Sequence, residues 1–205
     1  EWLKLREAAD IKARNGDVAD AVAARFAQRG EISVIDLGCG TGANLRATAA
    51  LLPDRQTWTL VDHDETLLQV ARRELSAWAD TYESLDGEET ALRLTKGHSS
   101  LSVRLKRCDL AKDLKSALAA SYDLVTASAL FDLVSETFIR DLARQVFEQR
   151  AAFYSLLTYN GIQRWQPHRP ADNQMTSAYH RHQMTDKGFG PAAGPLAAAH
   201  LADQF

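Results

Sequence analysis

Residues 33–42 read SVIDLGCGTG, an apolar strand that ends in an acid and runs into a turn with glycine at three alternate positions. A helical pattern over residues 44–52 follows directly and stops before Pro53. Glycine lets backbone N–H groups approach a ligand closely, and the first turn of a helix offers unpaired N–H groups with a partial positive charge. The stretch therefore predicts a binding site for a nucleotide-like ligand.

The glycines alone are compatible with two kinds of cofactor. Gly38, Gly40 and Ala43 also satisfy the dinucleotide pattern G-x-G-x-x-G/A, and Asp62 lies at about the distance expected for a ribose-binding acid. Asp36 argues against a dinucleotide, because a carboxylate before the turn would repel a pyrophosphate. A cofactor with an amino-acid end would instead bring an ammonium group. A purely structural role stays open too, since Asp36 could hold only the amides of its own turn.

The stretch DLGCGTG, residues 36–42, closely resembles motif I of the class I S-adenosylmethionine-dependent methyltransferases, and further matches follow in the family's order as far as residue 159. The resemblance implies an α/β fold, a mostly parallel, doubly wound Rossmann-like sheet with helices on both faces. It also implies that S-adenosylmethionine is the cofactor, with its methionine end near Asp36. The residues of the turn expected to contact it are Gly38, Cys39, Gly40 and Asn44.

Hydropathy divides the chain into three parts of one domain. Residues 1–30 read as an N-terminal helical cap, residues 31–159 as the cofactor-binding core, and residues 160–205 as a substrate-side loop followed by a helix from Pro195. Strands and helices alternate in the core, which predicts parallel strands with right-handed crossovers. The expected strands are residues 32–37, 58–62, 101–107, 122–128 and 151–159.

Two features concern the edges of this sheet. Residues 91–95 are expected to form a hairpin with residues 101–107, and the family's strand order places 101–107 at the sheet edge. The antiparallel C-terminal hairpin of the family is not visible after Tyr159. Because an unpaired fifth strand would expose a row of backbone groups, we expect further residues beyond Phe205.

In an open α/β sheet the ligand lies outside the carboxyl ends of the strands. Asp62 ends the second expected strand, and an ionised carboxylate there could accept both ribose hydroxyls. The alternative role of Asp62, capping the next helix, suits Asp64 better. His63 stands where the family usually has an apolar residue against the adenine, and its imidazole could either pack there or face solvent. The resemblance has Asp109 and Leu110 bind the adenine edge and puts Ser128 beside the methyl donor. A cap remains an equal alternative for Asp109.

No catalytic residue is identified by the sequence alone. Candidates that could orient an acceptor or take a proton are Asp132, His168 and His182. The last two lie in residues 160–191, which read as a long irregular segment rich in aromatic and basic residues. His180 and His182 could share a metal in a strand, but without a matching acid or cysteine cluster no metal site is predicted.

Composition restricts the remaining possibilities. The chain has 205 residues, of which 45% are hydrophobic, and a net charge of −3, so one sizeable core and no nucleic-acid surface are expected. Two unpaired cysteines and no membrane-length apolar stretch favour a cytoplasmic protein without a membrane partner. The pattern predicts O-, N- or C-methylation of a small molecule and gives no oligomeric state. Two alternatives remain, an NAD-dependent oxidoreductase and a non-catalytic S-adenosylmethionine-binding module.

Overall fold

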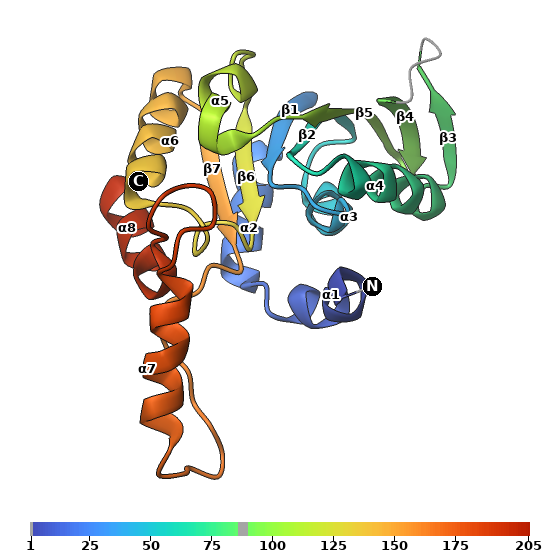
Figure 1. Cartoon of the computed structure of the whole chain (residues 1–205). Coiled ribbons are helices and arrows are strands. Elements are labelled where there is room, and N and C mark those ends of the chain that lie inside the picture. Colours follow the sequence, from blue (N-terminus) through green and yellow to red (C-terminus); the bar gives the residue numbers. More distant parts are fainter. Residues whose placement is uncertain (1, 86–89) are drawn as a thin grey trace. The chain divides into compact units, whose positions relative to one another are not determined.

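The computed structural model of the chain describes residues 2–85 and 90–205 (Figure 1). Within these ranges one seven-stranded sheet has the order β3-β4-β5-β2-β1-β6-β7. Strands β5, β2, β1, β6 and β7 run parallel, whereas β4 is antiparallel to both β3 and β5. The strands are β1 (Glu31–Leu37), β2 (Arg55–Asp62), β3 (Thr81–Ser84), β4 (Ala91–Lys96), β5 (Ser99–Arg107), β6 (Leu124–Ser128) and β7 (Ala152–Leu156).

Helices alternate with the parallel strands, as the sequence predicts. They are α1 (Trp2–Lys12), α2 (Gly16–Phe26), α3 (Ala43–Thr48), η1 (Ala49–Leu51), α4 (Glu65–Trp78), α5 (Leu110–Ala117), α6 (Glu136–Gln149), α7 (Asp172–Gln183), η2 (Gly194–Leu196) and α8 (Ala197–Gln204). Several begin at a side chain that accepts a backbone N–H, namely Asn15 before α2, Asp64 before α4, Asp109 before α5 and Ser135 before α6.

The parallel strands alternate which side chains face each side of the sheet. Val34 of β1 joins a buried cluster with Leu45 of α3 and with Leu68 and Leu75 of α4. The next residue, Ile35, is fully buried on the opposite side of the strand. Helix α5 lies on the other side of the sheet from α3 and α4 (Figure 1). Both faces of the centre are therefore covered, as in a doubly wound α/β sheet.

The chain divides into two compact units. The first contains the whole sheet and comprises Glu1–Ser128 and Gln149–Leu157. The second comprises Ala129–Glu148 and Thr158–Phe205. Within the second unit, the N–H of Ala193 donates to the carbonyl of Val134 across 2.7 Å, and the rings of Phe138 and Phe189 pack edge to face. These contacts join α6 and the residues just before it to the segment that precedes η2 and α8.

Two expectations about the sheet edge have different outcomes. The hairpin of β4 with β5 is confirmed, since Lys96 pairs with Ser99 across its turn. The placement of residues 101–107 at the edge is wrong, because β4 and then β3 extend the sheet beyond β5. Strand β3 is exposed along its whole length, so it lacks the apolar alternation by which a strand is recognised.

The prediction of irregular structure throughout residues 160–191 is also wrong. Helix α7 occupies Asp172–Gln183, and His180 and His182 lie on this helix. Gln183 is the one buried residue of this helix, so the sequence has no apolar stripe from which the helix could be predicted. Its start is set locally, because the carboxylate of Asp172 accepts the N–H of Arg169. The helix expected from Pro195 is confirmed as η2 and α8.

Candidate functional site

The turn after β1 is a left-handed backbone stretch built from glycine. Gly38, Gly40 and Gly42 have φ of +66°, +53° and +75°, values that side chains bearing a Cβ disfavour. A Cβ on Gly42 would also meet Leu75 of α4 at 3.4 Å. The contact with Leu75 is at an ordinary van der Waals distance, so the turn requires glycine for its backbone conformation.

Asp62 holds this turn in place from the neighbouring strand. Its side chain is 7% exposed, and Oδ2 accepts the N–H of Gly40 across 2.9 Å. Oδ1 accepts the N–H of Asp64 across 3.0 Å. Helix α4 is capped by Asp64, which accepts the N–H of Thr66, as the sequence predicts. Each carboxylate oxygen of Asp62 keeps a second lone pair for a ligand hydroxyl.

Asp36 is completely buried at the end of β1. Its Oδ1 accepts the Nδ2 group of Asn44 across 2.8 Å. The same Nδ2 donates to Thr126 Oγ1 at 3.1 Å, so Asn44 joins α3 to β1 and β6. Asp36 Oδ2 is buried and accepts no hydrogen bond from residues 2–85 and 90–205. An unpaired buried carboxylate oxygen is costly, and a ligand donor would relieve that cost.

Two ionisable groups at the glycine turn, Asp36 and Cys39, have shifted pKa values. The pKa of Asp36 is raised from 3.8 to about 7, chiefly by burial; the Asn44 hydrogen bond and the charge of Arg14 lower it, and the charge of Asp62 adds a smaller upward effect. Cys39 is buried beside both acids, and burial, followed by the charges of Asp36 and Asp62, raises the pKa of its thiol. Burial thus disfavours the ionised form of Asp36, and a cationic ligand group beside this carboxylate would favour ionisation.

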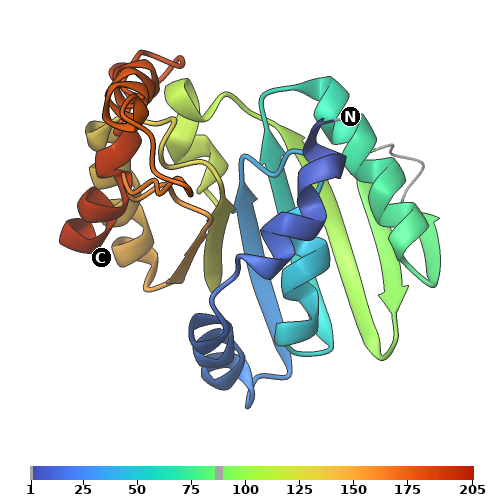
Figure 2. The same cartoon turned by 90° about the horizontal axis from the view of Figure 1, so that it is seen from below.

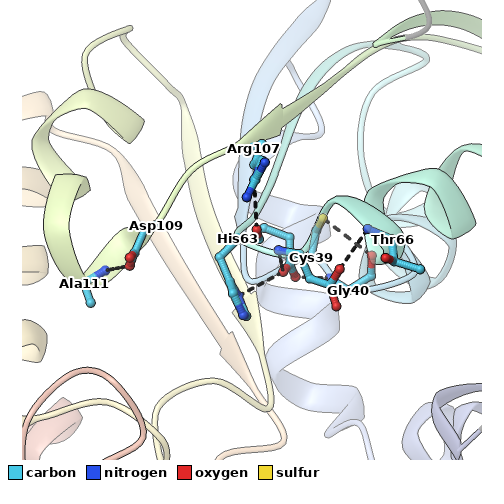
Figure 3. A network of polar contacts seen from close by, with 9 residues as sticks. Cys39, Gly40, His63, Thr66, Arg107, Asp109 and Ala111 are labelled. Atoms are coloured by element: carbon cyan, nitrogen blue, oxygen red, sulfur yellow. Dashed lines mark hydrogen bonds and ion pairs between the residues drawn. The ribbon is translucent and has the colours of Figure 1, made fainter.

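The remaining predicted cofactor contacts lie on neighbouring strand ends (Figure 3). His63 follows Asp62 directly and is 78% exposed, with Nδ1 at 3.3 Å from Asp62 Oδ1. Its carbonyl accepts from Arg107 Nε at the end of β5. Ser128 ends β6, one residue beyond Ala127, which pairs with Leu37 of β1. The parallel register therefore brings these strand ends to one edge of the sheet.

Asp109 lies to one side of that group and caps α5 (Figure 3). Its Oδ1 accepts the N–H of Ala111, and Oδ2 pairs with Lys112 at 2.7 Å. The hydrogen bond from Lys112 lowers the pKa of Asp109. Leu110 is buried in the first turn of α5. The structure thus gives Asp109 the capping role that the sequence left open, and its carboxylate remains 43% exposed.

The three catalytic candidates all belong to the second compact unit. Asp132 is half-buried, and its carbonyl accepts the N–H of Gly194. His168 is exposed, with Nε2 at 3.9 Å from Asp172, and His182 lies exposed on α7. A pair that the sequence did not single out lies there too, since Tyr159 Oη and His180 Nε2 are 2.8 Å apart.

Sequence reasoning also missed the polar residues behind Asp36. Arg14, between α1 and α2, donates from Nη2 to Asn44 Oδ1 at 2.9 Å and from Nη1 to Thr48 Oγ1 at 3.0 Å. Thr126 in β6 is fully buried. A threonine inside the apolar run LVTAS was the available signal for Thr126. No local pattern pointed to Arg14, because its partners lie 30 and 34 residues away.

Within residues 2–85 and 90–205, no three His, Cys, Asp or Glu side chains are grouped so that they could hold a metal ion. No helix in the same ranges is long and apolar enough to span a membrane.

The parallel order β5-β2-β1-β6-β7, the glycine turn after β1 and the acids near the carboxyl ends of β1 and β2 form a doubly wound, Rossmann-like α/β fold, as the resemblance to class I methyltransferases predicts. In particular, the chain is similar to trans-aconitate 2-methyltransferase from Acidovorax sp. (strain JS42), with 30% identity over 139 residues that cover 62% of this chain and 53% of the relative. The same enzyme from Acidovorax ebreus (strain TPSY) matches with equal identity and coverage. The chain thus spans about half the length of these curated relatives.

Among solved structures, the chain is similar to an O-methyltransferase family protein from Burkholderia thailandensis. The TM-score is 0.49 and the identity 18%, over 92% of this chain and 48% of that one. No family model matches the chain.

Proposed function

We propose that the protein transfers the methyl group of S-adenosylmethionine to a small-molecule acceptor. The observation that carries the proposal is the unpaired, buried Oδ2 of Asp36 behind a left-handed glycine turn. An amino-acid ammonium is the donor that such an acid attracts, whereas a pyrophosphate would meet the negative charge of Asp36 and Asp62. The similarity to curated methyltransferases supports the same cofactor.

The chain's own residues would hold the cofactor at both ends. Asp36 would face the ammonium group, and the turn residues Gly38, Cys39 and Gly40 would lie along the methionine moiety. The free lone pairs of Asp62 would accept the ribose hydroxyls while its present bonds keep the turn in place. The adenine would lie near His63, Asp109 and Leu110, where the exposed carboxylate of Asp109 offers an acceptor for the exocyclic amine.

When bound, the cofactor supplies a methyl group already activated on a sulfonium, so the protein's work is alignment and exclusion of water. Ser128 would border the methyl donor from the end of β6. Asp132, His168 and His182 are the residues we propose for orienting the acceptor or removing its proton. A carboxylate acceptor requires no base, because it is already a nucleophile.

The acceptor is proposed to be a small anion or neutral molecule. The curated relatives are named for trans-aconitate, a carboxylate. Within residues 158–187 the cationic side chains Arg164, Arg169, Arg181 and Lys187 outnumber the acids Asp172 and Asp186. Arginine can bind a carboxylate through two parallel hydrogen bonds. We further propose that this reaction takes place in the cytoplasm, in keeping with two unpaired cysteines.

Two measurements test the proposal. Calorimetric titration with S-adenosylhomocysteine and with NADH identifies the cofactor, and S-adenosylmethionine carrying a deuterated methyl group, incubated with a metabolite extract, reports transfer by mass spectrometry. Binding of S-adenosylhomocysteine together with a labelled metabolite is expected. Binding without label in any metabolite would indicate a non-catalytic module. Binding of NADH alone would replace the proposal with an oxidoreductase.

A further inference from the structure

A continuous chain of hydrogen bonds runs from the N-terminal helices to Asp36. Arg14 Nη2 donates to Asn44 Oδ1, and Asn44 Nδ2 donates to Asp36 Oδ1. A branch continues from Asn44 Nδ2 to Thr126 Oγ1, whose hydroxyl donates to the carbonyl of Tyr154. Each link is between 2.8 and 3.1 Å long. Asn44 is 4% exposed, so its amide sits within this chain rather than in water.

The donor and acceptor roles in this series of hydrogen bonds are fixed by Arg14. A guanidinium only donates hydrogen bonds, so the atom of Asn44 that faces Arg14 must be the oxygen. Thr48 Oγ1 adds a second bond to that oxygen at 3.1 Å, while it accepts from Arg14 Nη1. The amide nitrogen of Asn44 is therefore turned toward Asp36, where it meets an acceptor. In the opposite orientation, an amide oxygen would face a carboxylate oxygen.

We propose that Arg14 is a positioning residue of the cofactor site, which holds the Asn44 amide so that Asp36 stays an ionised acceptor for the ammonium group of the cofactor. The inference rests on the proposed function for the identity of that ligand. It gives the N-terminal helical segment a part in binding, although this segment lies outside the glycine turn in sequence.

Without Arg14 a different arrangement becomes favourable. The Asn44 amide can rotate so that its oxygen faces Asp36, and a protonated Asp36 can donate to it. This alternative would remove the negative charge that the ammonium group requires. The charged and titratable groups that act on Asp36 are Arg14, from the α1–α2 connection, and Asp62, from β2. The thiol of Cys39 lies beside both acids, and burial raises the pKa of Tyr154 in β7.

The backbone at Arg14 is restrained on both sides. Its N–H donates to the carbonyl of Ile11 at the end of α1, and Asn15 caps α2 by accepting the N–H of Val18. Glu7 of α1 pairs with Arg46 of α3 through two carboxylate oxygens, and Arg46 also donates to the carbonyl of Thr41 in the glycine turn. The turn that carries the Arg14 guanidinium is therefore held in place by hydrogen bonds at both of its ends.

The test compares calorimetric titrations of S-adenosylhomocysteine between pH 6 and pH 8 for wild type, Arg14→Met and Arg14→Lys. The methionine variant keeps much of the side-chain volume but cannot donate, whereas lysine restores a charged donor. Arg6→Met is the matched control. Arg6 also lies in the N-terminal helical segment, but its guanidinium pairs with Asp10 of the same helix and not with Asn44. Circular dichroism melting confirms that each variant is folded.

In wild type the dissociation constant should fall as pH rises through about 7, where Asp36 ionises. Removing a nearby positive charge raises a carboxyl pKa by about 1 or more, so Arg14→Met should move this midpoint upward by about one pH unit. At pH 7 its dissociation constant should be roughly five- to sixfold larger, because the ionised fraction of Asp36 falls from about one half to about one tenth. Arg14→Lys should recover most of both effects, and Arg6→Met should change neither.

An unchanged midpoint in a folded Arg14→Met protein would overturn the inference, even if affinity fell. The carboxyl carbon resonance of Asp36, titrated by NMR in the ligand-free proteins, separates this result from failure of the proposed function. If wild type did not bind S-adenosylhomocysteine, the proposed function would fail, while an upward shift of the Asp36 resonance midpoint in Arg14→Met would still support the Arg14–Asn44–Asp36 coupling. An unmoved resonance would refute that coupling.

Discussion

The backbone N–H of Gly40 donates to Oδ2 of Asp62 across 2.9 Å, which ties the glycine turn after β1 to the acid that ends β2. Asp62 therefore has a structural role in the turn as well as the ribose-binding role that we propose. A substitution of Asp62 is expected to affect both affinity and stability, and the neighbouring acid Asp64 allows the two to be separated.

Asp62→Ala should weaken S-adenosylhomocysteine binding by roughly 1.5–3 kcal/mol, because charge-assisted hydrogen bonds are lost. Calorimetric titration measures the change. Asp64→Ala is the control, since it removes the α4 cap, costs about 1 kcal/mol of stability and should leave affinity unchanged. Equal dissociation constants for wild type and Asp62→Ala would contradict the ribose assignment.

Asp36→Asn should change how the free energy of unfolding depends on pH. The folded-state pKa of about 7 lies above the ordinary 3.8, so the native protein binds more protons than the unfolded chain between these values. Stability contributed by the protonated acid is complete below pH 4 and is lost as pH rises through 7. Relative to wild type, Asp36→Asn should gain up to roughly 3–4 kcal/mol across this window.

Urea unfolding of both proteins at several pH values between 4 and 8 gives that difference. Asp80→Asn serves as the opposite control, because hydrogen bonds from Lys96 and Gly97 lower the pKa of this exposed acid. A pH-independent difference between wild type and Asp36→Asn would show that Asp36 is ionised throughout.

Gly42→Ala should destabilise the protein by about 1–2 kcal/mol, because its φ of +75° is unfavourable for alanine. The new Cβ would lie 3.4 Å from Leu75, an ordinary van der Waals distance, so the backbone should account for most of the loss. Thermal melting reports the loss. Gly97→Ala has a similar positive φ with open space around it, so a similar loss is expected there. A much larger loss for Gly42→Ala would show that the contact with α4 contributes.

Tyr159→Phe should loosen the second compact unit without altering cofactor affinity. It removes the bond between Tyr159 and His180 but keeps the edge-to-face contact of Tyr159 with Tyr179. A single hydrogen bond of this kind contributes about 1 kcal/mol. Faster amide hydrogen exchange in α7, measured by mass spectrometry, is the expected result. Unchanged exchange there would mean that the pair does not stabilise the helix.

The sequence allowed prediction of the parallel core because the information was local. The short, nearly continuous apolar run around Val34 is typical of a parallel strand buried on both faces, and Asp64 before an amphipathic stretch marks the start of α4. The acids at the strand ends could be expected to meet because parallel strands bring their carboxyl ends to one edge. Whether these residues bind the predicted cofactor groups remains to be tested.

Other features depend on contacts that no local pattern encodes. Strand β3 exists because its backbone pairs with β4, while its side chains are exposed. Helix α7 has too few buried residues to show a helical apolar period. The contact of Arg14 with Asn44 depends on how the turn between α1 and α2 meets α3, so it became visible only in the folded chain.

The buried Cys39 has a practical consequence. Only the thiolate reacts readily with alkylating or disulfide reagents, and a shielded thiol with a raised pKa forms little of it. Cys108, at the end of β5, is also buried, and burial raises its pKa as well. A thiol reagent should therefore label each cysteine of the native protein slowly, at a rate set by transient opening of the structure around it. Cys39 would report opening at the glycine turn, and Cys108 would report opening at the end of β5.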